Sequence, residues 1–308
     1  MKILVGYTGF VGSNIYAKGQ FDAVFNSKNI TQAFGLQPDL LIYAGLRAEK
    51  YLANTAPEKD LEQILEAQEN IRRIAPKKLV LISTIDVFKN PNGADENTPV
   101  DTDNLHPYGY NRYLLEQWVR EHYPDALIIR LPGLFGINLK KNFIYDYINV
   151  IPFMLKQEKM AELSIREPGL PGYYTLQSNG FYKLNAITPE EKKLLRQTFR
   201  ALNFTALNFT DSRSRYQFYP LSRLWDDIQT ALSNDLRLWH PATEPVEAGE
   251  LYRYLSGKTF VNELGGTPAD YDFRTLHAAC FGGTGSYVAG KEAVLQEIKA
   301  FVEGSCAL

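Results

Sequence analysis

The sequence predicts an α/β fold built on a doubly wound parallel sheet, with a smaller mixed lobe toward the C-terminus. The chain opens with a short apolar run, "KILVGY", which leads through a glycine-rich turn into a segment with helical spacing. Later apolar runs are continuous rather than alternating with polar residues, and amphipathic segments separate them. Continuous apolar strands that alternate with helices are typical of a parallel sheet covered on both faces.

The elements of the first half follow in order. Gly19 ends the first helical segment, and Pro38 and Asp39 introduce the third strand. Residues 58–74 carry apolar residues at i, i+3, i+4 and i+7, the spacing of an amphipathic helix. We expect strands within 2–7, 22–30, 38–46, 77–88 and 125–136, and helices within 9–19, 58–74 and 108–123.

The second half is less regular. Thr188 and Glu191 have the spacing of a capping box at a helix start, and residues 201–210 repeat "ALNFT", which favours an apolar strand segment. We expect further helices within 142–156, 188–202, 223–232 and 291–302, and a strand within 236–243. We predict that the doubly wound domain comprises residues 1–160 together with about 201–240, and the smaller lobe about 161–200 and 241–308.

Composition limits the class of protein. The 308 residues are 45% hydrophobic, and a net charge of −2 does not favour nucleic acid or an acidic membrane as a partner. Cys280 and Cys306 form no CxxC pair and the four histidines are scattered, so we expect no metal site. The sequence has no apolar run near the roughly 18 residues that span a bilayer and no signal-peptide pattern. We therefore expect a cytoplasmic protein.

The glycine-rich turn is the first candidate site. Three glycines follow the opening strand with the spacing G-x-x-G-x-x-G, ending where a helix begins. Glycines allow a tight turn and a close approach to a pyrophosphate, which then lies at a helix N-terminus. The pattern predicts a Rossmann-type dinucleotide-binding loop made of Gly6, Gly9, Phe10, Val11 and Gly12.

The end of the second strand bears on the choice of dinucleotide. An acid at this point would hold the ribose 2′-hydroxyl of NAD. The residues here are Asn26, Ser27 and Lys28, with no acid, and Ser27 and Lys28 suit a 2′-phosphate. We therefore favour NADP(H) over NAD(H).

Three further stretches follow the loop in a familiar order: "YAGL" after the third strand, "STIDVF" after the next, and "PYGYNR" at a helix start. With them the chain resembles the extended short-chain dehydrogenase/reductases, of the nucleotide-sugar epimerase/dehydratase class. "ISTIDVF" followed by "DENTPVDTDNLHPYG" most resembles the dTDP-4-dehydrorhamnose reductases. The resemblance is specific over about residues 1–136 and loose beyond them.

The resemblance implies roles for particular residues. Tyr108 would be the catalytic acid/base, and Thr84 would donate a hydrogen bond to the reacting oxygen. Ala44 and Gly45 would lie behind the cofactor. Pro132 and Gly133 would line its nicotinamide end.

Arg112 departs from the family pattern. The family has a lysine here, which lowers the pKa of the tyrosine and holds the nicotinamide ribose. An arginine keeps the charge and can bond two ribose hydroxyls, but its higher pKa excludes a proton relay. We expect cofactor binding to survive, with the effect on activity left open.

The resemblance also implies a nucleotide-sugar substrate and a homodimer formed through the helices at 58–74 and 108–122. Arg215 matches an arginine that grips the diphosphate, and a guanidinium suits phosphate. Three functions remain open: reduction of a 4-keto sugar, epimerisation or dehydration with tightly held NAD, and a catalytically impaired dinucleotide sensor. The residues beside Thr84 are Ile85 and Asp86, not the Asp-Glu of dehydratases, which disfavours dehydration.

Overall fold

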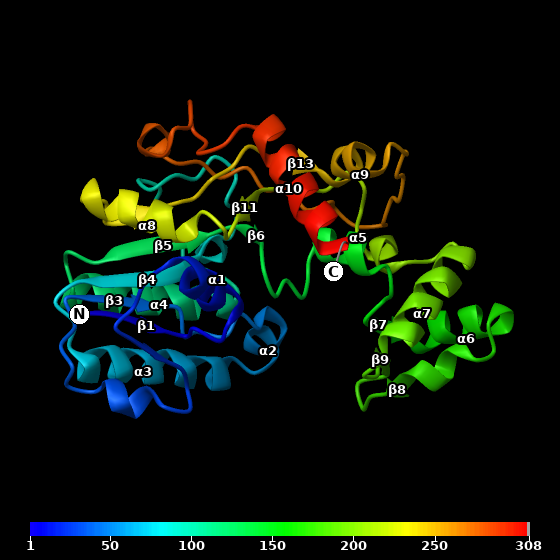
Figure 1. Cartoon of the computed structure of the whole chain (residues 1–308), viewed down its shortest axis with the longest axis horizontal. Coiled ribbons are helices and arrows are strands. Elements are labelled where there is room, and N and C mark those ends of the chain that lie inside the picture. The colour runs from blue at the N-terminus through cyan, green and yellow to red at the C-terminus, as the bar shows by residue number, and fades with distance from the viewer. Residues whose placement is uncertain (307–308) are drawn as a thin grey trace. The chain divides into compact units, whose positions relative to one another are not determined.

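The computed structural model describes residues 1–306 and contains a six-stranded parallel sheet, which confirms the predicted fold class (Figure 1). Each strand is short and mostly apolar, and three of the four residues of β1 and all five of β5 are buried. In sheet order the strands are β12 (Leu238–Trp239), β5 (Leu127–Leu131), β4 (Leu79–Thr84), β3 (Leu40–Tyr43), β1 (Lys2–Val5) and β2 (Ala23–Phe25).

The strand order places a switch point beside β1. The chain leaves β1 for the neighbour on one side, β2, and then returns to the neighbour on the other side, β3. Only residues 26–39 join these two strands, and they contain a single 3-10 turn, η1 (Ile30–Ala33). In open α/β sheets, ligands bind at the carboxyl ends of the strands at such a point.

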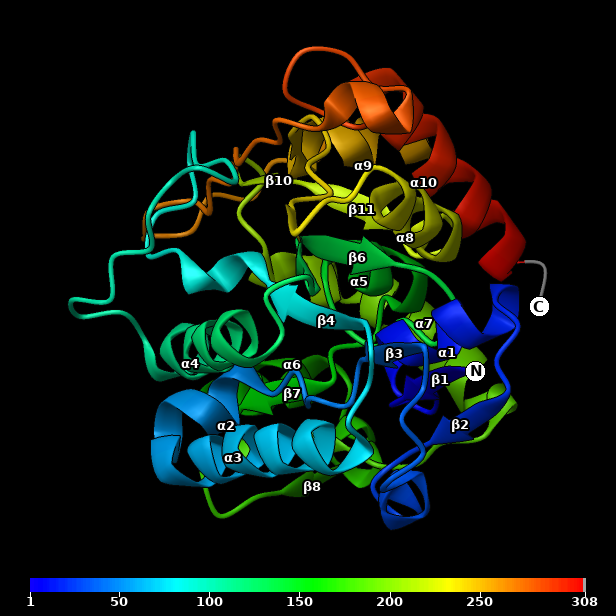
Figure 2. The same ribbon diagram turned by 90° about the vertical axis from the view of Figure 1, so that its left-hand side faces the viewer.

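Helices cover both faces of the sheet. On one face lie α3 (Pro57–Ile74) and α4 (Pro107–His122), whose apolar stripes pack on β1, β3 and β4. On the other face lie α1 (Phe10–Lys18) and α8 (Leu224–Ser233). The short helix α2 (Lys50–Thr55) lies beside α3 and α4 (Figure 2).

A late segment of the chain is bound to the loop that follows β4. The Glu96 carboxylate accepts hydrogen bonds from the His240 and Leu276 backbone N–H groups, both 2.8 Å, and from the Thr275 hydroxyl at 2.6 Å. The Phe273 N–H donates to the buried Gln217 side chain at 2.8 Å. These bonds hold residues 273–276 in place.

The remaining elements near this segment are short. They are η2 (Ile85–Val87), η5 (Ala278–Phe281) and two two-stranded sheets, formed by β6 (Gly133–Phe135) with β11 (Phe218–Pro220) and by β10 (Arg215–Tyr216) with β13 (Val246–Glu247). The last helix is α10 (Lys291–Cys306).

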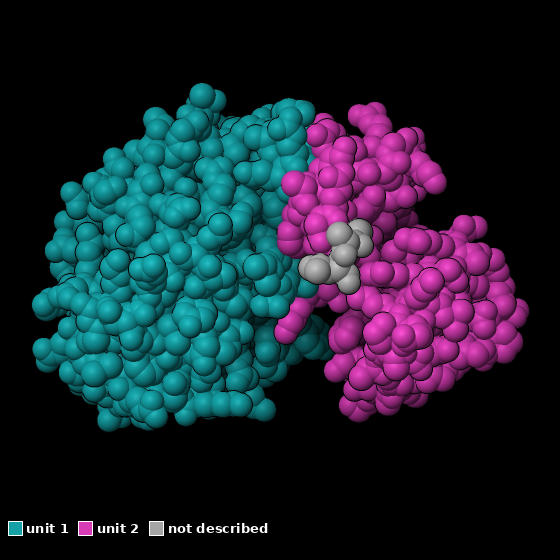
Figure 3. Space-filling view, viewed as in Figure 1, with its two compact units in different colours: residues 1–139, 215–246, 270–298 teal, residues 140–214, 247–269, 299–308 magenta. Residues whose placement is uncertain are grey.

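The chain forms two compact units (Figure 3). Unit 1 comprises Met1–Leu139, Arg215–Val246 and Asp270–Ile298, and unit 2 comprises Lys140–Ser214, Glu247–Ala269 and Lys299–Leu308. These extents differ from the predicted domains of 1–160 with 201–240 and 161–200 with 241–308. Unit 1 ends earlier, near Leu139, and includes the 270–298 segment because of the bonds to Glu96.

Unit 2 is a small mixed structure with its own core. A three-stranded antiparallel sheet packs with two helices around Leu155, Leu163 and Phe199. The predicted capping box at Thr188 and Glu191 is confirmed, whereas the predicted strand at 201–210 is wrong because its residues form a capped 3-10 turn. The elements are α5 (Phe143–Asn149), β7 (Met154–Lys156), α6 (Gln157–Arg166), η3 (Leu170–Tyr173), β8 (Tyr174–Leu176), β9 (Phe181–Leu184), α7 (Pro189–Ala201), η4 (Ala206–Phe209) and α9 (Ala248–Ser256).

Residues 1–306 lack two features, a membrane-spanning helix and a cluster of metal ligands. None of their helices combines the length and the apolar character needed to cross a membrane. Within the same residues, His, Cys, Asp and Glu side chains form no group of three or more that could hold a metal ion.

Candidate active site

The glycine loop joins β1 to α1 in a conformation that needs glycine. Gly6 has φ of +92°, and a Cβ there would lie 2.3 Å from the Ala44 carbonyl oxygen. A Cβ on Gly12 would lie 2.1 Å from the Gly6 carbonyl oxygen. The Gly6 N–H donates to the Phe25 carbonyl at 2.7 Å, and Ala44 N–H donates to the Val5 carbonyl at 2.9 Å. The loop is therefore held between the ends of β2 and β3 through the backbone.

The start of α1 is open to a ligand. Gly9 is the exposed N-cap residue and has no side chain to cap the first turn, whose residues Phe10 and Val11 are only partly buried. The first N–H groups of a helix have no partner within the helix and carry a partial positive charge, so they attract anions. Its first turn contains no acidic residue. The geometry fits the pyrophosphate of a dinucleotide.

The predicted 2′-phosphate residues follow β2. The Asn26 N–H donates to the Asn29 side chain at 2.8 Å, and the Lys28 N–H donates to the Asn26 side chain at 2.9 Å, which closes a small loop. Ser27 and Lys28 are exposed. Lys28 makes no ion pair with any residue in 1–306, so its ammonium is available to an anion.

The other predicted cofactor residues lie at the same edge of the sheet. Ala44 and Gly45 follow β3, the neighbour of β1. Pro132 separates β5 from β6, and Gly133 opens β6, where a Cβ would lie 2.8 Å from the Gln217 carbonyl oxygen. All of these residues follow carboxyl ends of parallel strands, where sheets of this kind bind ligands.

Thr84 and Tyr108 come together at the next strand. Thr84 is the last residue of β4, and its hydroxyl accepts a hydrogen bond from the Asp86 N–H at 3.2 Å. Tyr108 lies in the first turn of α4, where the Thr84 side chain is close enough to its phenol to lower the pKa of Tyr108. The start of α4 can approach this closely because residue 109 is glycine: a Cβ there would lie 2.1 Å from the Asp86 carbonyl oxygen.

His106 fixes the same helix start. It is the N-cap residue of α4, and its Nδ1 accepts from the Gly109 N–H at 3.0 Å. The His106 ring lies beside the Tyr108 ring, with 6.4 Å between centroids. Burial lowers the pKa of His106, and the nearby Lys50 ammonium lowers it further.

Arg112 is buried and its charge is paired. Its guanidinium forms an ion pair with Asp60 of α3, and both residues are 3% exposed. It also donates to the Arg47 carbonyl at 2.8 Å and stacks on the Tyr108 ring, 3.9 Å from its centroid. Asn111 donates to the same Asp60 carboxylate at 2.9 Å. In this structure Arg112 therefore supports the Tyr108 ring from within the protein.

The pKa of Tyr108 is raised above its ordinary value. Burial of the phenol is the main cause, and Arg112 opposes it with its positive charge. The carboxylates of Asp86 and Asp60 add to the rise. A phenol in this setting stays protonated at neutral pH and can donate a proton to an oxygen that gains negative charge.

Three charged residues near Tyr108 were not identified as site residues from the sequence, and they are Lys50, Asp60 and Asp86. Lys50 and Asp86 form an ion pair with 3.0 Å between Lys50 Nζ and Asp86 Oδ1. Asp60 had a usable signal, since it lies in the stripe of buried residues that continues through Ile64, Ala67 and Ile71. An acid in an apolar stripe predicts a buried basic partner.

Arg215 lies in β10 of unit 1 and is already paired. Its Nε donates to the Asp270 carboxylate at 2.6 Å, and the Arg215 side chain is 44% exposed. The bond to Asp270 raises the pKa of Arg215 and lowers that of Asp270. A diphosphate would have to compete with Asp270 for this guanidinium.

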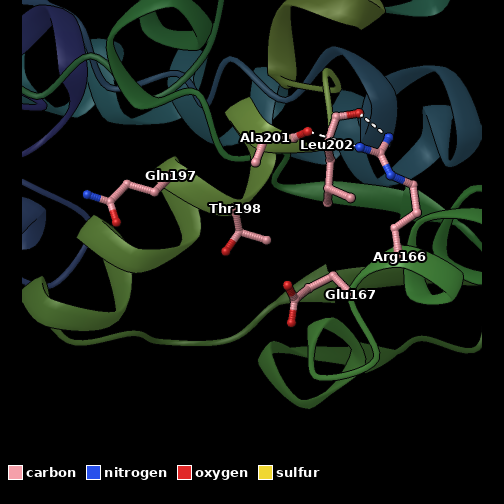
Figure 4. Close-up of a pocket in the computed structure, with 6 residues that line it drawn as sticks. All are labelled: Arg166, Glu167, Gln197, Thr198, Ala201 and Leu202. Carbon is pink, nitrogen blue, oxygen red and sulfur yellow. Dashed lines mark hydrogen bonds between the residues drawn. The ribbon is translucent and has the colours of Figure 1, made fainter.

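A hollow of about 320 Å³ lies elsewhere, in unit 2, between α6 and α7 (Figure 4). Arg166 on its rim donates to the carbonyls of Ala201 and Leu202, both at 3.0 Å, and so caps the C-terminal end of α7. None of the predicted site residues lines this hollow.

No protein-family model matches the chain, and no curated protein matches it in sequence. Solved structures do match. The dTDP-4-dehydrorhamnose reductase of Yersinia enterocolitica is 13% identical, with a TM-score of 0.63 and coverage of 99% of each chain. The dTDP-4-dehydrorhamnose reductase of Bacillus anthracis, solved in complex with NADP, is 16% identical, with a TM-score of 0.62 and coverage of 98% of this chain and 97% of that one.

The UDP-glucose 4-epimerase of Thermotoga maritima, solved with UDP-glucose, is 14% identical, with a TM-score of 0.61 and coverage of 98% of each chain. These neighbours are the reductases and epimerases that the sequence resembles. At such identities the likeness shows that this chain shares their fold.

Proposed function

We propose that this protein is an NAD(P)-dependent oxidoreductase acting on a nucleotide-linked sugar, with reduction of a 4-keto sugar as its reaction. The observation that carries the proposal is the alignment of two features at one sheet edge. The open glycine loop follows β1, and the Thr84–Tyr108 pair follows β4, two strands away. A dinucleotide held at the first would extend its reactive ring toward the second.

The cofactor-binding residues fit NADP(H) in this proposal. Gly6, Gly9 and Gly12, with Phe10 and Val11, would hold the pyrophosphate at the start of α1. Ser27 and Lys28, placed by Asn26, would bind the 2′-phosphate, which suits the exposed side chain of Lys28. Ala44 and Gly45 would lie behind the dinucleotide, and Pro132 and Gly133 beside its nicotinamide. When bound, the nicotinamide supplies the hydride.

The chain's own residues supply the acid–base chemistry. Tyr108 donates its proton to the sugar oxygen as that oxygen gains charge, and Thr84 holds the same oxygen by a hydrogen bond. The raised pKa of Tyr108 keeps the phenol protonated for this step. Arg112 holds the Tyr108 ring in place by stacking on it. Arg215 would bind the substrate diphosphate after exchange with Asp270.

Two alternative functions have support of their own. Epimerisation with tightly bound NAD is favoured by the similarity to a UDP-glucose 4-epimerase. A dinucleotide sensor with impaired catalysis is favoured by Arg112, whose charge is committed to Asp60 rather than presented to a ribose. We further propose a cytoplasmic homodimer, formed through α3 and α4, as the sequence resemblance implies.

Dinucleotide binding tests the proposal first. Purified protein would be titrated with NADPH and with NADH by nucleotide fluorescence, and we expect tighter binding of NADPH. Gly9→Val should block binding by placing a branched side chain at the exposed start of α1. Gly172→Val, at an open position with no atom within 4 Å of its Cβ, is the matched control.

Turnover then separates the alternatives. Oxidation of NADPH on a panel of 4-keto nucleotide sugars supports the reductase. NAD that stays bound through purification supports the epimerase, and NADPH binding without turnover supports the sensor. Absence of binding by either dinucleotide, with no effect of Gly9→Val, would overturn all three.

A further inference from the structure

The family pattern requires a positive charge close to the catalytic tyrosine. In this chain the residue at the expected position, Arg112, is 3% exposed and paired with an equally buried carboxylate, Asp60. The two opposite charges lie in contact, so Asp60 offsets part of the effect that Arg112 has on the pKa of Tyr108. Arg112 is therefore not accessible to a ligand, and a solvent-accessible positive charge near Tyr108 must come from another residue.

Lys50 is such a group, and α2 places it. Asn54, one helical turn after Lys50, accepts a hydrogen bond from the Tyr108 N–H at 3.1 Å. Residues i and i+4 lie on the same face of a helix, so Lys50 faces the start of α4 as Asn54 does. Residue 47, just before this helix, also contacts the site, because its carbonyl accepts from Arg112.

Asp86 holds the Lys50 ammonium in this position. The ion pair spans 3.0 Å, and its side chains are 42% and 22% exposed, far more than those of Arg112 and Asp60. Asp86 also connects the ammonium to the proposed catalytic residues: its N–H bonds Thr84 at 3.2 Å, and its carbonyl oxygen lies against Gly109, next to Tyr108.

We propose that Lys50 is the cation on which the acid–base work of Tyr108 depends, and that Asp86 positions it. This proposal rests on the proposed function and names a residue that the Tyr-x-x-x-Lys pattern does not contain. The charged groups that act on the Tyr108 phenol are Arg112 on its own helix, Asp86 after β4 and Asp60 from α3. Lys50 from α2 reaches this set through its ion pair with Asp86, and it also acts on His106 at the helix cap.

The two ion pairs have different consequences. The Arg112–Asp60 pair is sealed, so a ligand cannot exchange with either partner. The Lys50–Asp86 pair is accessible, so a ribose or sugar hydroxyl can compete for the Lys50 ammonium and leave it beside the reacting oxygen. The charge of Asp86 raises the pKa of Tyr271 and the charge of Lys50 lowers it, so the Tyr271 phenol also lies near this ion pair.

The ionisation of Tyr108 tests the proposal without substrate or cofactor. Fluorinated tyrosine, whose phenol is more acidic, would be incorporated throughout, and the Tyr108 signal would be followed by ¹⁹F NMR against pH. Tyr108→Phe assigns that signal. Because no turnover is measured, a failure of this proposal is distinguishable from a failure of the proposed function, which the NADPH titration tests.

Two variants should act in opposite directions. Lys50→Met leaves the Asp86 carboxylate unneutralised and should raise the Tyr108 pKa by about one pH unit. Asp86→Asn removes the negative charge and should lower it. Lys50→Arg keeps the charge and should restore the wild-type value. Lys77→Met is the matched control, since Lys77 forms a similar ion pair with Asp39, 2.7 Å long, at the opposite edge of the sheet.

One further variant decides between the two pairs. Asp60→Asn combined with Arg112→Met removes both sealed charges together, so that no unpaired buried charge remains. Because Arg112 affects the Tyr108 pKa more than Asp60 does, we expect this double variant to raise that pKa, but by less than Lys50→Met does. The proposal is overturned if Lys50→Met titrates like Lys77→Met, or if the double variant raises the pKa as much as Lys50→Met does.

Discussion

The glycine loop after β1 and the start of α4 lie at the same edge of the sheet but are built in different ways. The loop is held by backbone hydrogen bonds, from the Gly6 N–H to the Phe25 carbonyl and from the Ala44 N–H to the Val5 carbonyl. Its conformation requires residues without a Cβ at positions 6 and 12. The start of α4 is made of side-chain charges that come from separate parts of the chain, Lys50, Asp60 and Asp86. A backbone site is specified locally, whereas a charged site depends on distant partners.

We expect the largest effect from Gly12→Ala, which disrupts the glycine loop. In Gly12→Ala the new methyl group would lie 2.1 Å from the Gly6 carbonyl oxygen, and backbone cannot move away as a side chain can. We expect NADPH affinity to fall at least 100-fold, with a lower unfolding temperature. Gly172→Ala has open space and serves as the control. Unchanged affinity in Gly12→Ala would show that the loop does not bind the dinucleotide.

We expect the next largest effect from Arg112→Met, which disrupts the Arg112–Asp60 ion pair at the start of α4. Arg112→Met leaves the buried Asp60 carboxylate unpaired, which should cost about 3–5 kcal/mol of the free energy of unfolding. Urea denaturation measures this change. Arg72→Met, which removes an exposed ion pair with Glu69 on α3, should leave the denaturation midpoint unchanged.

The companion double variant with Asp60→Asn should recover most of the stability lost in Arg112→Met, because both charges are then absent. If Arg112→Met alone were as stable as the wild-type protein, the pair would not be buried in solution.

Tyr108→Phe separates the two sites functionally. It removes the proton donor while leaving the glycine loop intact, so kcat should fall by about 10²–10⁴ with the NADPH dissociation constant unchanged. Because the pKa of Tyr108 is raised above 10, the wild-type reduction rate should be flat across neutral pH and fall only where the phenol ionises. A variant that still reduces the sugar at the wild-type rate would exclude Tyr108 as the donor.

The smallest effect concerns cofactor choice. Lys28→Ala removes an exposed ammonium at the end of β2 and should weaken NADPH binding about tenfold, about 1.4 kcal/mol, with little change for NADH. Lys18→Ala, an exposed lysine in the last turn of α1, is the control. Equal losses for both dinucleotides would place Lys28 away from the 2′-phosphate.

The sequence was informative where the structure is local. The strand–loop–helix at the start and the parallel sheet follow from patterns within a few residues of each position. The family resemblance, not a local pattern, implied that Thr84 and Tyr108 share a site. The family resemblance was also sufficient to place Arg112 one turn after Tyr108. It was not sufficient to show that the Arg112 side chain turns toward α3, because that direction is decided by Asp60, a residue 52 positions away in the chain.

The extents of the domains were harder to predict for a similar reason. Residues 270–290 have little strand or helix pattern, and their place in unit 1 depends on bonds to Glu96 and Gln217. Short polar contacts of this kind leave no periodic signal in the sequence. The apolar repeat at 201–210 misled for the opposite reason: its residues are apolar enough for a strand, but Thr205 and Asn208 cap a 3-10 turn.

The bonds that Glu96 forms with the 275–276 segment set an order of events during synthesis. The partners are separated by about 180 positions, so the loop after β4 cannot form these bonds until residues 275–276 have been made. Contacts of such long range are slow to form and leave intermediate states exposed. Residues 1–139 cut out as a separate fragment would lack these partners, so the Glu96 carboxylate would lose the bonds to Thr275 and Leu276.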